Sequence, residues 1–404
     1  MPAASTPPTF MPISRRARSL RLLVAAMAVA ALSGCASLRV DKAAQVASGV
    51  ASHWLCDDVF ITGRDAQAVI DERIKPQPGM GLVSWAMSHR LDTEKREVTT
   101  TIAGGFETRA RYRDGFGCTS LAAGDSDPAW PSADTDDPAP PPQVPPLAGL
   151  AVVTAADARL REVLRNAIDS ADRQRHRTKA IVVLRDGRLI AEHYARGYGV
   201  ETPVLGFSMT KSVTSALVGI LVGQGRLRLD QPAPVPAWQA ADDPRRAITI
   251  EQLLRQTSGL DLPQNNSGFD RTSQVMYTVR DKATAFASDP AAAAPGTRWS
   301  YTDGHYMLLS RIVRDAVGGH ADAVRRFARN ELFAPLGMRH VVMDFDATGT
   351  PLGSSHLLAS ARDWARFGQL YLDDGVAGGR RLLPEGWVKA SATPTLDTGY
   401  GAGF

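Results

Sequence analysis

A serine and a lysine three residues apart are the first pair in this sequence that could do covalent chemistry. The chain contains Ser208 and Lys211, and a mainly apolar stretch follows at 212–222. If that stretch is a helix, Ser208 lies at its N-terminus and Lys211 lies one turn along the same face. The helix dipole favours negative charge developing on the serine, and a lysine with a lowered pKa can accept the serine proton. The spacing therefore predicts a serine nucleophile with a lysine base.

The same pair has a plainer interpretation, in which Ser208 only caps a helix and Lys211 is a solvated surface residue. A single Ser-x-x-Lys match carries little information in a chain of 404 residues. However, residues 216–222 are apolar nearly all round, which is typical of a buried helix. A lysine in the first turn of such a helix is harder to keep in solvent, and this favours the catalytic interpretation.

A second candidate group is Tyr301. It follows turn-forming residues at 295–297 and precedes a helical pattern that begins at Asp303. A phenol beside a lysine is a plausible proton acceptor, so Tyr301 is the third catalytic candidate. The alternative is a structural tyrosine with Asp303 as the helix N-cap.

Five ordered segments of the chain resemble the serine β-lactamase and penicillin-recognising superfamily. The branch that this chain resembles most contains class C β-lactamases, family VIII esterases and 6-aminohexanoate-dimer hydrolases. The resemblance covers about residues 180–404. The segments are 208–211 (SMTK), 253–260 (LLRQTSGL), 295–301 (PGTRWSY), 332–338 (LFAPLGM) and 361–368 (ARDWARFG). Five motifs in this order are far more specific than one Ser-x-x-Lys.

The resemblance implies acyl transfer through a covalent intermediate on Ser208. Lys211 and Tyr301 would shuttle the proton, and water would release the acid. The backbone N–H of Ser208 would donate one oxyanion hydrogen bond, a contact worth about 3–4 kcal/mol of barrier. We expect a small-molecule ester or amide as substrate, with peptide-like or β-lactam compounds as variants of that class. No cofactor and no metal is expected, and oligomeric state is not readable.

The sequence departs from the family pattern in two places. Family members usually have Asn two residues after the tyrosine, where this chain has Asp303. An ionised Asp303 near Lys211 would raise the lysine pKa and make it a weaker base, which favours esters or amides over β-lactams. We expect Asp303→Asn to change the ester-to-amide rate ratio. The family also has a third motif, Lys-x-Gly or His-x-Gly, which the chain does not reach by Phe404. We therefore expect an incomplete sequence whose later sheet strands are missing; a truncated natural protein is the alternative.

Two rival classes of protein fit part of this pattern. A Ser-His-Asp hydrolase needs a nucleophile elbow, and the nearest match at 206–210 lacks its final glycine. His305 and His356 lie near family motifs, but we expect them in the core or at a cleft rim. A lipoprotein that binds peptidoglycan or a partner without turnover would tolerate Asp303 and the missing third motif. A purely structural lipoprotein would leave five hydrolase motifs unused.

The elements that must position these residues follow an α+β pattern. We expect a β-lactamase-like fold over residues 150–404, with an antiparallel sheet flanked by helices and a large helical insert. The pair Asp186-Gly187, which lies between two apolar runs, is a strong signal for a β-hairpin. The expected elements are a helix over 155–172, hairpin strands at 180–184 and 189–194, and helices over 303–317 and 360–372. Because a hairpin without sheet partners is marginal, the chain as given should fold poorly.

A small β-rich unit is expected at residues 35–122, with strands near 81–87, 96–102 and 106–112. Residues 123–149 are rich in Pro, Asp and Ser and indicate a linker or an extended strap. Cys56 and Cys118 lie in the small unit, and an oxidising compartment would pair them. That bond would close a loop of about 63 residues and stabilise the fold by ~4 kcal/mol; two free buried thiols are the alternative. His53 and His89 alone share this segment and show no repeating ligand spacing, which argues against a metal site.

Residues 1–34 indicate a bacterial lipoprotein signal peptide. Four arginines precede an apolar run of about eleven residues, which is typical of a secretory signal and too short to span a membrane. Residues 32–36 resemble the lipobox, in which the cysteine, here Cys35, becomes lipidated. Ala36 lacks the aspartate that retains such proteins in the inner membrane, so we expect a periplasmic protein anchored to the outer membrane of a Gram-negative bacterium. A plain secretory signal or a twin-arginine signal is the alternative.

The charge balance excludes a polyanion-binding protein. Lys and Arg total 46 and Asp and Glu total 42, but four of the basic residues belong to the signal segment. The remaining chain is neutral, with 42 groups of each sign. A neutral body lacks the basic surface that nucleic-acid binding requires, so we expect no nucleic-acid partner.

Overall fold

A computed structural model describes residues 40–122, 124–128, 130, 138–169 and 177–404. The expected signal peptide and Cys35 lie outside the described residues. Two large sets of buried apolar side chains organise the rest, one around the helix that precedes Cys56 and one around the helix that follows Ser208. Helices and antiparallel strands are mixed throughout, so the α+β prediction is confirmed. None of the helices in the described residues is long and apolar enough to cross a membrane.

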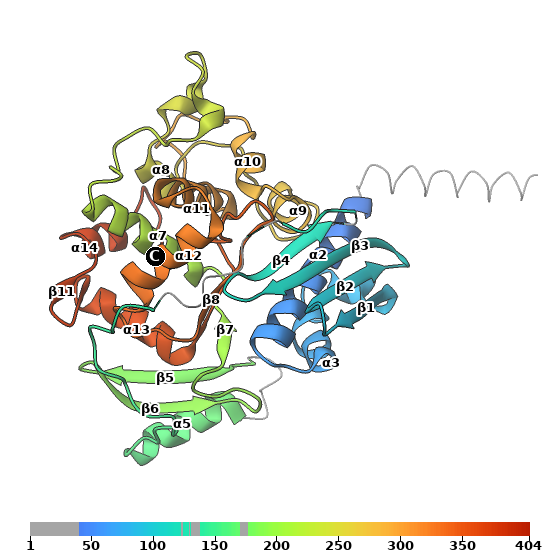
Figure 1. The fold of residues 1–404 in the computed structure, drawn as a ribbon. Coiled ribbons are helices and arrows are strands. Elements are labelled where there is room, and N and C mark those ends of the chain that lie inside the picture. Colours follow the sequence, from blue (N-terminus) through green and yellow to red (C-terminus); the bar gives the residue numbers. More distant parts are fainter. Residues whose placement is uncertain (1–39, 123, 129, 131–137, 170–176) are drawn as a thin grey trace, which may run out of the picture.

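The N-terminal unit is a four-stranded antiparallel sheet covered by one long helix (Figure 1). Ser48 of that helix hydrogen-bonds Thr100 and Thr108 of the sheet, each at 2.9 Å, which fixes the helix on the sheet face. The helical elements are α2 (Val40–Cys56), η1 (Asp57–Ile61), α3 (Ala66–Val69), η2 (Ile70–Ile74), α4 (Met80–Val83) and η3 (Ser84–Ala86). The strands, in sheet order, are β1 (Met87–Asp92), β2 (Glu97–Ile102), β3 (Gly105–Arg113) and β4 (Gly117–Ala122).

The sequence-based expectations for this unit are partly right. Strands at 96–102 and 106–112 are confirmed as β2 and β3. The strand expected at 81–87 is wrong, because residues 80–86 form α4 and η3 and the strand begins only at Met87. Apolar and polar residues alternate in this segment, but buried and exposed residues do not, so the alternation does not reflect a strand with one buried face. The predicted disulfide is present between Cys56 and Cys118, with Cα atoms 6.1 Å apart.

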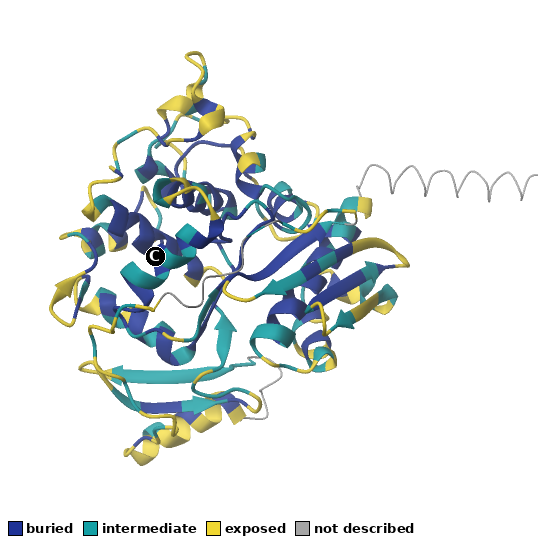
Figure 2. Cartoon of the chain, viewed as in Figure 1, coloured by how far each residue is buried: buried dark blue, intermediate teal, exposed yellow. Residues whose placement is uncertain are grey.

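The second part of the chain surrounds α7 (Met209–Gly223), which is buried on almost every side (Figure 2). A three-stranded antiparallel sheet lies beside it in the order β7 (Pro203–Leu205), β9 (Leu357–Ser360), β8 (Val341–Met343). The other helices are α8 (Ile250–Leu254), α9 (Arg271–Thr278), α10 (Lys282–Ala287), α11 (Asp303–Val317), α12 (Ala321–Ala328), α13 (Ala361–Leu372) and α14 (Trp387–Ala392). Short elements complete it: η4 (Pro236–Trp238), η5 (Pro244–Ala247), η6 (Arg329–Phe333), β10 (Val376–Ala377) and β11 (Arg380–Arg381).

The predicted hairpin is confirmed as β5 (Ala180–Arg185) and β6 (Arg188–Tyr194), which form a separate two-stranded sheet. Asp186 and Gly187 both have positive φ, at 51° and 71°, as the tight turn requires. Helix α5 (Ala158–Asp169) covers the hairpin and is shorter than the expected 155–172, whose last residues are not described. Leu164 and Ile168 of this helix are buried, whereas Val163 is 54% exposed.

The helices expected at 303–317 and 360–372 are confirmed as α11 and α13. Thr302, not Asp303, is the N-cap of α11 and accepts from Gly304 N at 3.2 Å. Ser360 caps α13 by accepting from Asp363 N at 3.1 Å. Asp363 does not accept a hydrogen bond from the backbone N–H of Ser360, as a full capping box requires. Its carboxylate accepts from the backbone N–H groups of residues 339 and 340 instead. For α13 the sequence pattern therefore predicts the start of the helix and the Ser360 cap, but not the contacts of Asp363.

The N-terminal unit packs closely on the second part of the chain. Helix α2 crosses α9 at Gly49, where an added Cβ would lie 2.6 Å from the carbonyl oxygen of Tyr277. Cys118 N donates to Asp344 Oδ1 at 2.8 Å, which joins β4 to the segment after β8. Figure 1 shows α2 and α9 side by side. Only glycine permits this approach of the two helices.

Candidate active site

Ser208 lies where β7 passes into α7. Gly206 N donates to the carbonyl of Leu357 at 2.9 Å, which continues the β7–β9 ladder up to the turn. An added Cβ on Gly206 would lie 2.2 Å from the Trp364 ring, so this turn requires glycine. Phe207 then has a left-handed φ of 45°, an unusual conformation for a bulky residue. This tight turn presents Ser208 on the surface at the start of a buried helix.

The Ser208 side chain does not cap its helix, which contradicts the plainer interpretation. Ser208 has helical φ and ψ, and its hydroxyl makes no capping hydrogen bond. Instead its Oγ accepts from Lys211 Nζ at 3.3 Å. Within the described part of the chain no acceptor bonds the Ser208 N–H, so this group is open to donate to a substrate oxygen. The hydroxyl is therefore exposed to substrate on one side and faces a cation on the other.

Lys211 is 1% exposed, which excludes a solvated surface lysine. Its ammonium donates to Ser208 Oγ and to the carbonyl oxygen of Ser354 at 2.9 Å, and it forms an ion pair with Asp303. Burial acts most strongly on the pKa of Lys211 and lowers it, but the charges and hydrogen bonds of Asp303 and Tyr301 outweigh burial and leave the pKa above its usual value. Lys211 is accordingly cationic at neutral pH, as the sequence analysis expected from Asp303.

Gln264 holds Asp303 in place, and sequence reasoning missed it. Its amide oxygen accepts from Asp303 N at 2.6 Å, and its amide nitrogen donates to Asp303 Oδ2 at 3.1 Å. The other carboxylate oxygen, Oδ1, faces Lys211. Gln264 therefore fixes which edge of the carboxylate meets the lysine.

Tyr301 faces the lysine from the loop before α11. Its ring centroid lies 4.9 Å from Lys211 Nζ, and the ring of Tyr400 meets it edge-on at 5.8 Å. The buried Gln256 anchors both neighbours of Tyr301, because its carbonyl accepts from Ser300 N at 2.9 Å and its Oε1 accepts from Thr302 N at 2.6 Å. Gln256 belongs to the segment 253–260, so that segment positions the tyrosine loop.

The two histidines near the family motifs are buried, as expected, and neither contacts Ser208. His305 Nδ1 lies 3.2 Å from Gln256 Oε1, and its Nε2 lies 2.6 Å from Ser258 Oγ. Burial lowers the pKa of His305 to about 3, so its ring is neutral. His356 is also buried, and its Nδ1 lies 2.7 Å from Ser355 Oγ. This geometry gives no Ser-His-Asp triad on Ser208 within the described residues.

The N-terminal unit forms part of the surroundings of the nucleophile. The Trp54 ring of α2 meets the exposed Phe207 ring edge-on at 5.8 Å. The Arg73 guanidinium lies over both rings, at 4.5 Å from Trp54 and 5.5 Å from Phe207. Sequence reasoning assigned no role to residues 35–122, because contacts across 150 residues of sequence leave no local pattern.

The fold and the Ser208 site together define the class of this protein: a β-lactamase-like fold with a serine at the N-terminus of its central helix. Residues 122–404, more than half of the chain, match the family model described as Beta-lactamase. The chain therefore belongs to the Beta-lactamase family.

Known relatives include hydrolases and penicillin-binding proteins. The chain is 27% identical to 6-aminohexanoate-dimer hydrolase of Paenarthrobacter ureafaciens, over 56% of this chain and 61% of that protein. It is 30% identical to penicillin-binding protein 4 of Amycolatopsis lactamdurans, over 44% of this chain and 52% of that protein. The chain thus spans little more than half the length of these relatives. The solved structure of FmtA from Staphylococcus aureus aligns with a TM-score of 0.48 and 14% identity, covering 64% of this chain and 78% of that one.

Proposed function

We propose that this protein is a serine hydrolase that cleaves small esters or amides through an acyl-enzyme on Ser208. The observation that supports this most directly is the exposed Ser208 hydroxyl 3.3 Å from the buried Lys211 ammonium. A buried cation favours negative charge on the adjacent oxygen, and an exposed oxygen can reach a carbonyl carbon. Family membership supports the same reaction class.

The proposed reaction has two steps. Ser208 Oγ bonds to the carbonyl carbon while its proton passes to the neutral form of Lys211, with Tyr301 as the second shuttle group. The Ser208 N–H donates to the oxyanion. Collapse of the tetrahedral intermediate expels the alcohol or amine, which takes the proton, and water then repeats the sequence to free the acid. Because Asp303 keeps Lys211 protonated, we expect activity to rise with pH into the alkaline range.

The substrate class follows from the relatives and from Asp303. The relatives are named for hydrolysis of the 6-aminohexanoate dimer and for penicillin binding. Asp303 places a carboxylate next to the nucleophile, where it disfavours an anionic substrate group. We therefore rank neutral esters and amides above β-lactams. A panel of p-nitrophenyl esters, the 6-aminohexanoate dimer and a chromogenic cephalosporin tests this ranking.

A burst experiment tests the mechanism. With p-nitrophenyl butyrate in excess, we expect a burst of one p-nitrophenol per chain followed by slower turnover. Ser208→Ala should remove the burst and lower turnover by at least about a thousandfold. Ser288→Ala is the matched control, because Ser288 is an exposed serine at the end of α10. A burst that persists in Ser208→Ala would exclude Ser208 as the nucleophile.

The ion pair of Lys211 with Asp303 also favours a second candidate function, binding of peptidoglycan fragments without turnover. A lysine that Asp303 holds as a cation is a poor base, so a ligand bound at Ser208 would stay uncleaved. Titration calorimetry with muropeptides distinguishes the two functions. Saturable binding without a p-nitrophenol burst at any pH up to 10 would establish the binding function in place of the hydrolase.

We further propose that the protein is a periplasmic lipoprotein anchored at Cys35. The lipobox at 32–36 supports this, and the pairing of Cys56 with Cys118 fits an oxidising compartment. Metabolic labelling with an alkyne fatty acid should mark the wild-type protein and leave Cys35→Ala unmarked. Equal labelling of both would exclude Cys35 as the lipidated residue.

A further inference from the structure

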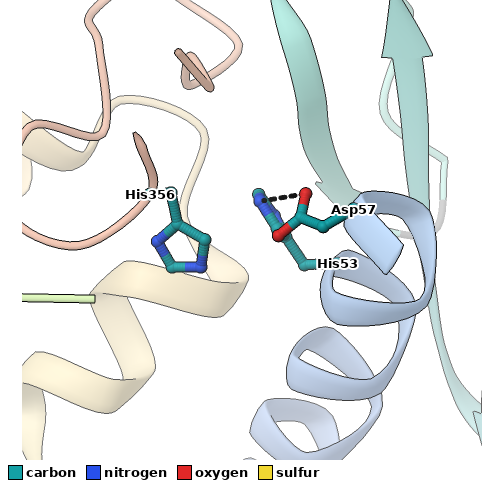
Figure 3. Close-up of side chains that lie close together, drawn as sticks. All are labelled: His53, Asp57 and His356. Carbon is teal, nitrogen blue, oxygen red and sulfur yellow. Dashed lines mark ion pairs between the residues drawn. The ribbon is translucent and has the colours of Figure 1, made fainter. Parts of the chain in front are cut away.

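A second cluster of chemistry-bearing side chains lies between the N-terminal unit and the second part of the chain. His53 near the end of α2 and Asp57 in η1 meet His356, which comes from the loop before β9 (Figure 3). One ligand atom from each of the three lies within 4.8 Å of the other two. Asp344 joins them, because its Oδ2 is 2.8 Å from His53 Nε2. All four side chains are at most 2% exposed.

The cluster contains polar atoms without partners in a place that solvent does not reach. Among the described residues, three atoms of the cluster have no hydrogen-bond partner: both carboxylate oxygens of Asp57 and the Nε2 of His356. A buried carboxylate without donors is strongly unfavourable unless a cation or a proton compensates it. The nearby Arg73 donates no hydrogen bond to Asp57, and its Nη1 pairs with Asp58 at 2.5 Å. These atoms therefore point to a missing positive partner.

The outer nitrogens of both histidines are already oriented. His53 Nδ1 lies 2.6 Å from Ser120 Oγ, and His356 Nδ1 lies 2.7 Å from Ser355 Oγ. A hydrogen bond at Nδ1 fixes the ring and directs Nε2 into the cluster, which is the usual arrangement behind a metal-ligating histidine. The Nε2 of His356 has no hydrogen-bond partner, and the Nε2 of His53 faces Asp344 Oδ2. Asp344 is held in the same way, since its Oδ1 accepts from Cys118 N at 2.8 Å and Oδ2 is left toward the cluster.

We propose that His53, Asp57, His356 and Asp344 bind one zinc ion. Two imidazoles and two carboxylates are a donor set that suits Zn²⁺, and the two carboxylates neutralise its charge. Zinc ligands lie at about 2.0–2.2 Å from the ion. The ligand atoms of His53, Asp57 and His356 must therefore move closer together, and Asp344 Oδ2 must move slightly away from His53 Nε2. Four protein ligands leave no open position, which makes the site structural and not catalytic. The proposal does not depend on the chemistry assigned to Ser208.

The ion would couple two distant parts of the chain. Two ligands come from the N-terminal unit, and the other two flank the β8–β9 connection. His356 is two residues from Ser354, whose carbonyl accepts from Lys211 Nζ. Zinc would thus clamp the N-terminal unit to the second part of the chain and hold the segment that receives the lysine. This proposal departs from the expectation of no metal, because ligands spread over about 300 residues show no repeating spacing.

Metal analysis of the full chain tests the proposal. After purification without chelators and dialysis against Zn²⁺, mass spectrometry of the digested protein should give about one zinc per chain. His53→Gln, Asp57→Asn and His356→Gln should each bind less than about a tenth of that. His89→Gln is the matched control, since His89 is exposed on β1 and should keep the full zinc content.

Measurements on the wild-type chain cover the case in which these variants do not fold. Removal of the ion with dipicolinate should lower Tm by about 5 °C or more, and added Zn²⁺ should restore it. Co²⁺ in place of Zn²⁺ should give visible absorption bands of a tetrahedral N- and O-ligated ion. No bound zinc, no change of Tm with chelator and no cobalt spectrum would overturn the proposal. Asp57 would then be a neutral acid bonded to Asp344, and Asp57→Asn should leave Tm unchanged.

Discussion

The buried Lys211 and the partly buried Asp303 form an ion pair directly behind Ser208. The lysine also reaches Ser208 Oγ at 3.3 Å and the Ser354 carbonyl at 2.9 Å, so one ammonium joins the nucleophile, the tyrosine loop and the β8–β9 connection. This pair is central to the protonation state of the site, because the charges and hydrogen bonds of Asp303 and Tyr301 together outweigh the effect of burial on the pKa of Lys211. The pH behaviour of the protein therefore depends on Asp303 more than on any other single residue.

Asp303→Asn should move the pH dependence of catalysis. Without the carboxylate, burial lowers the pKa of Lys211, and more of the lysine is neutral at a given pH. The alkaline rise of kcat/KM should shift to lower pH, with a severalfold gain at pH 7. A pH–rate profile with p-nitrophenyl butyrate measures this. If the rise stays at the same pH in the variant, Lys211 is not the base.

The same ion pair should stabilise the fold in a pH-dependent way. The folded-state pKa of Lys211 is raised, so its contribution is fully present below the unfolded value of about 10.4 and is lost as pH rises through the folded pKa. Wild type should therefore have a higher Tm than Asp303→Asn at pH 8, and the difference should shrink above pH 10.5. A difference that is constant from pH 8 to pH 11 would mean that the pair does not contribute through its charge.

Gln264 should act as a positioning residue for Asp303. Gln264→Ala removes one donor to the carboxylate and one acceptor for Asp303 N, so Asp303 is held less firmly against Lys211. We expect kcat at pH 7 to rise, in the same direction as in Asp303→Asn, with KM little changed. Gln264→Glu keeps the size but faces one carboxylate with another, so it should not restore the wild-type kcat. The exposed Gln239 provides the control variant Gln239→Ala. Equal kcat in all four proteins would show that Asp303 needs no such support.

The disulfide should stabilise the N-terminal unit. Cys56 and Cys118 are 62 residues apart in sequence, and closing a loop of that length is worth about 4 kcal/mol on the chain-entropy model. Calorimetry of the Cys56→Ala, Cys118→Ala double variant should show a lower Tm for the transition of this unit. Reduction of the wild type with dithiothreitol should reproduce the change, and it should have no effect on the double variant. Identical melting of all samples would contradict a stabilising role.

Local sequence patterns predicted the parts of the fold that local physics controls. The Asp186-Gly187 turn, the helix after Ser208 and the helix start at Ser360 all depend on residues within a few positions of one another. The segment 81–87 failed because its alternation of apolar and polar residues is not matched by burial in the tertiary fold.

The candidate site was predictable where family motifs contain it and not elsewhere. Ser208, Lys211, Tyr301 and Asp303 meet as the motif order implied. Gln256 was inside a quoted motif, but its role in holding both neighbours of Tyr301 needs a left-handed backbone at that residue, which only the structure shows. The contacts of Gln264, Trp54 and His356 join segments tens to hundreds of residues apart, and no spacing rule reaches that far.

Covalent trapping of the nucleophile tests the assignment of Ser208 most directly. The full chain is treated with a fluorophosphonate, which reacts covalently with activated serine hydroxyls, and the adduct is located by peptide mass spectrometry. We predict one adduct per chain, on Ser208. The adduct should be absent from Ser208→Ala and present in Ser288→Ala. An adduct on another serine, or an equal yield in Ser208→Ala, would contradict the assignment of Ser208 as the catalytic nucleophile.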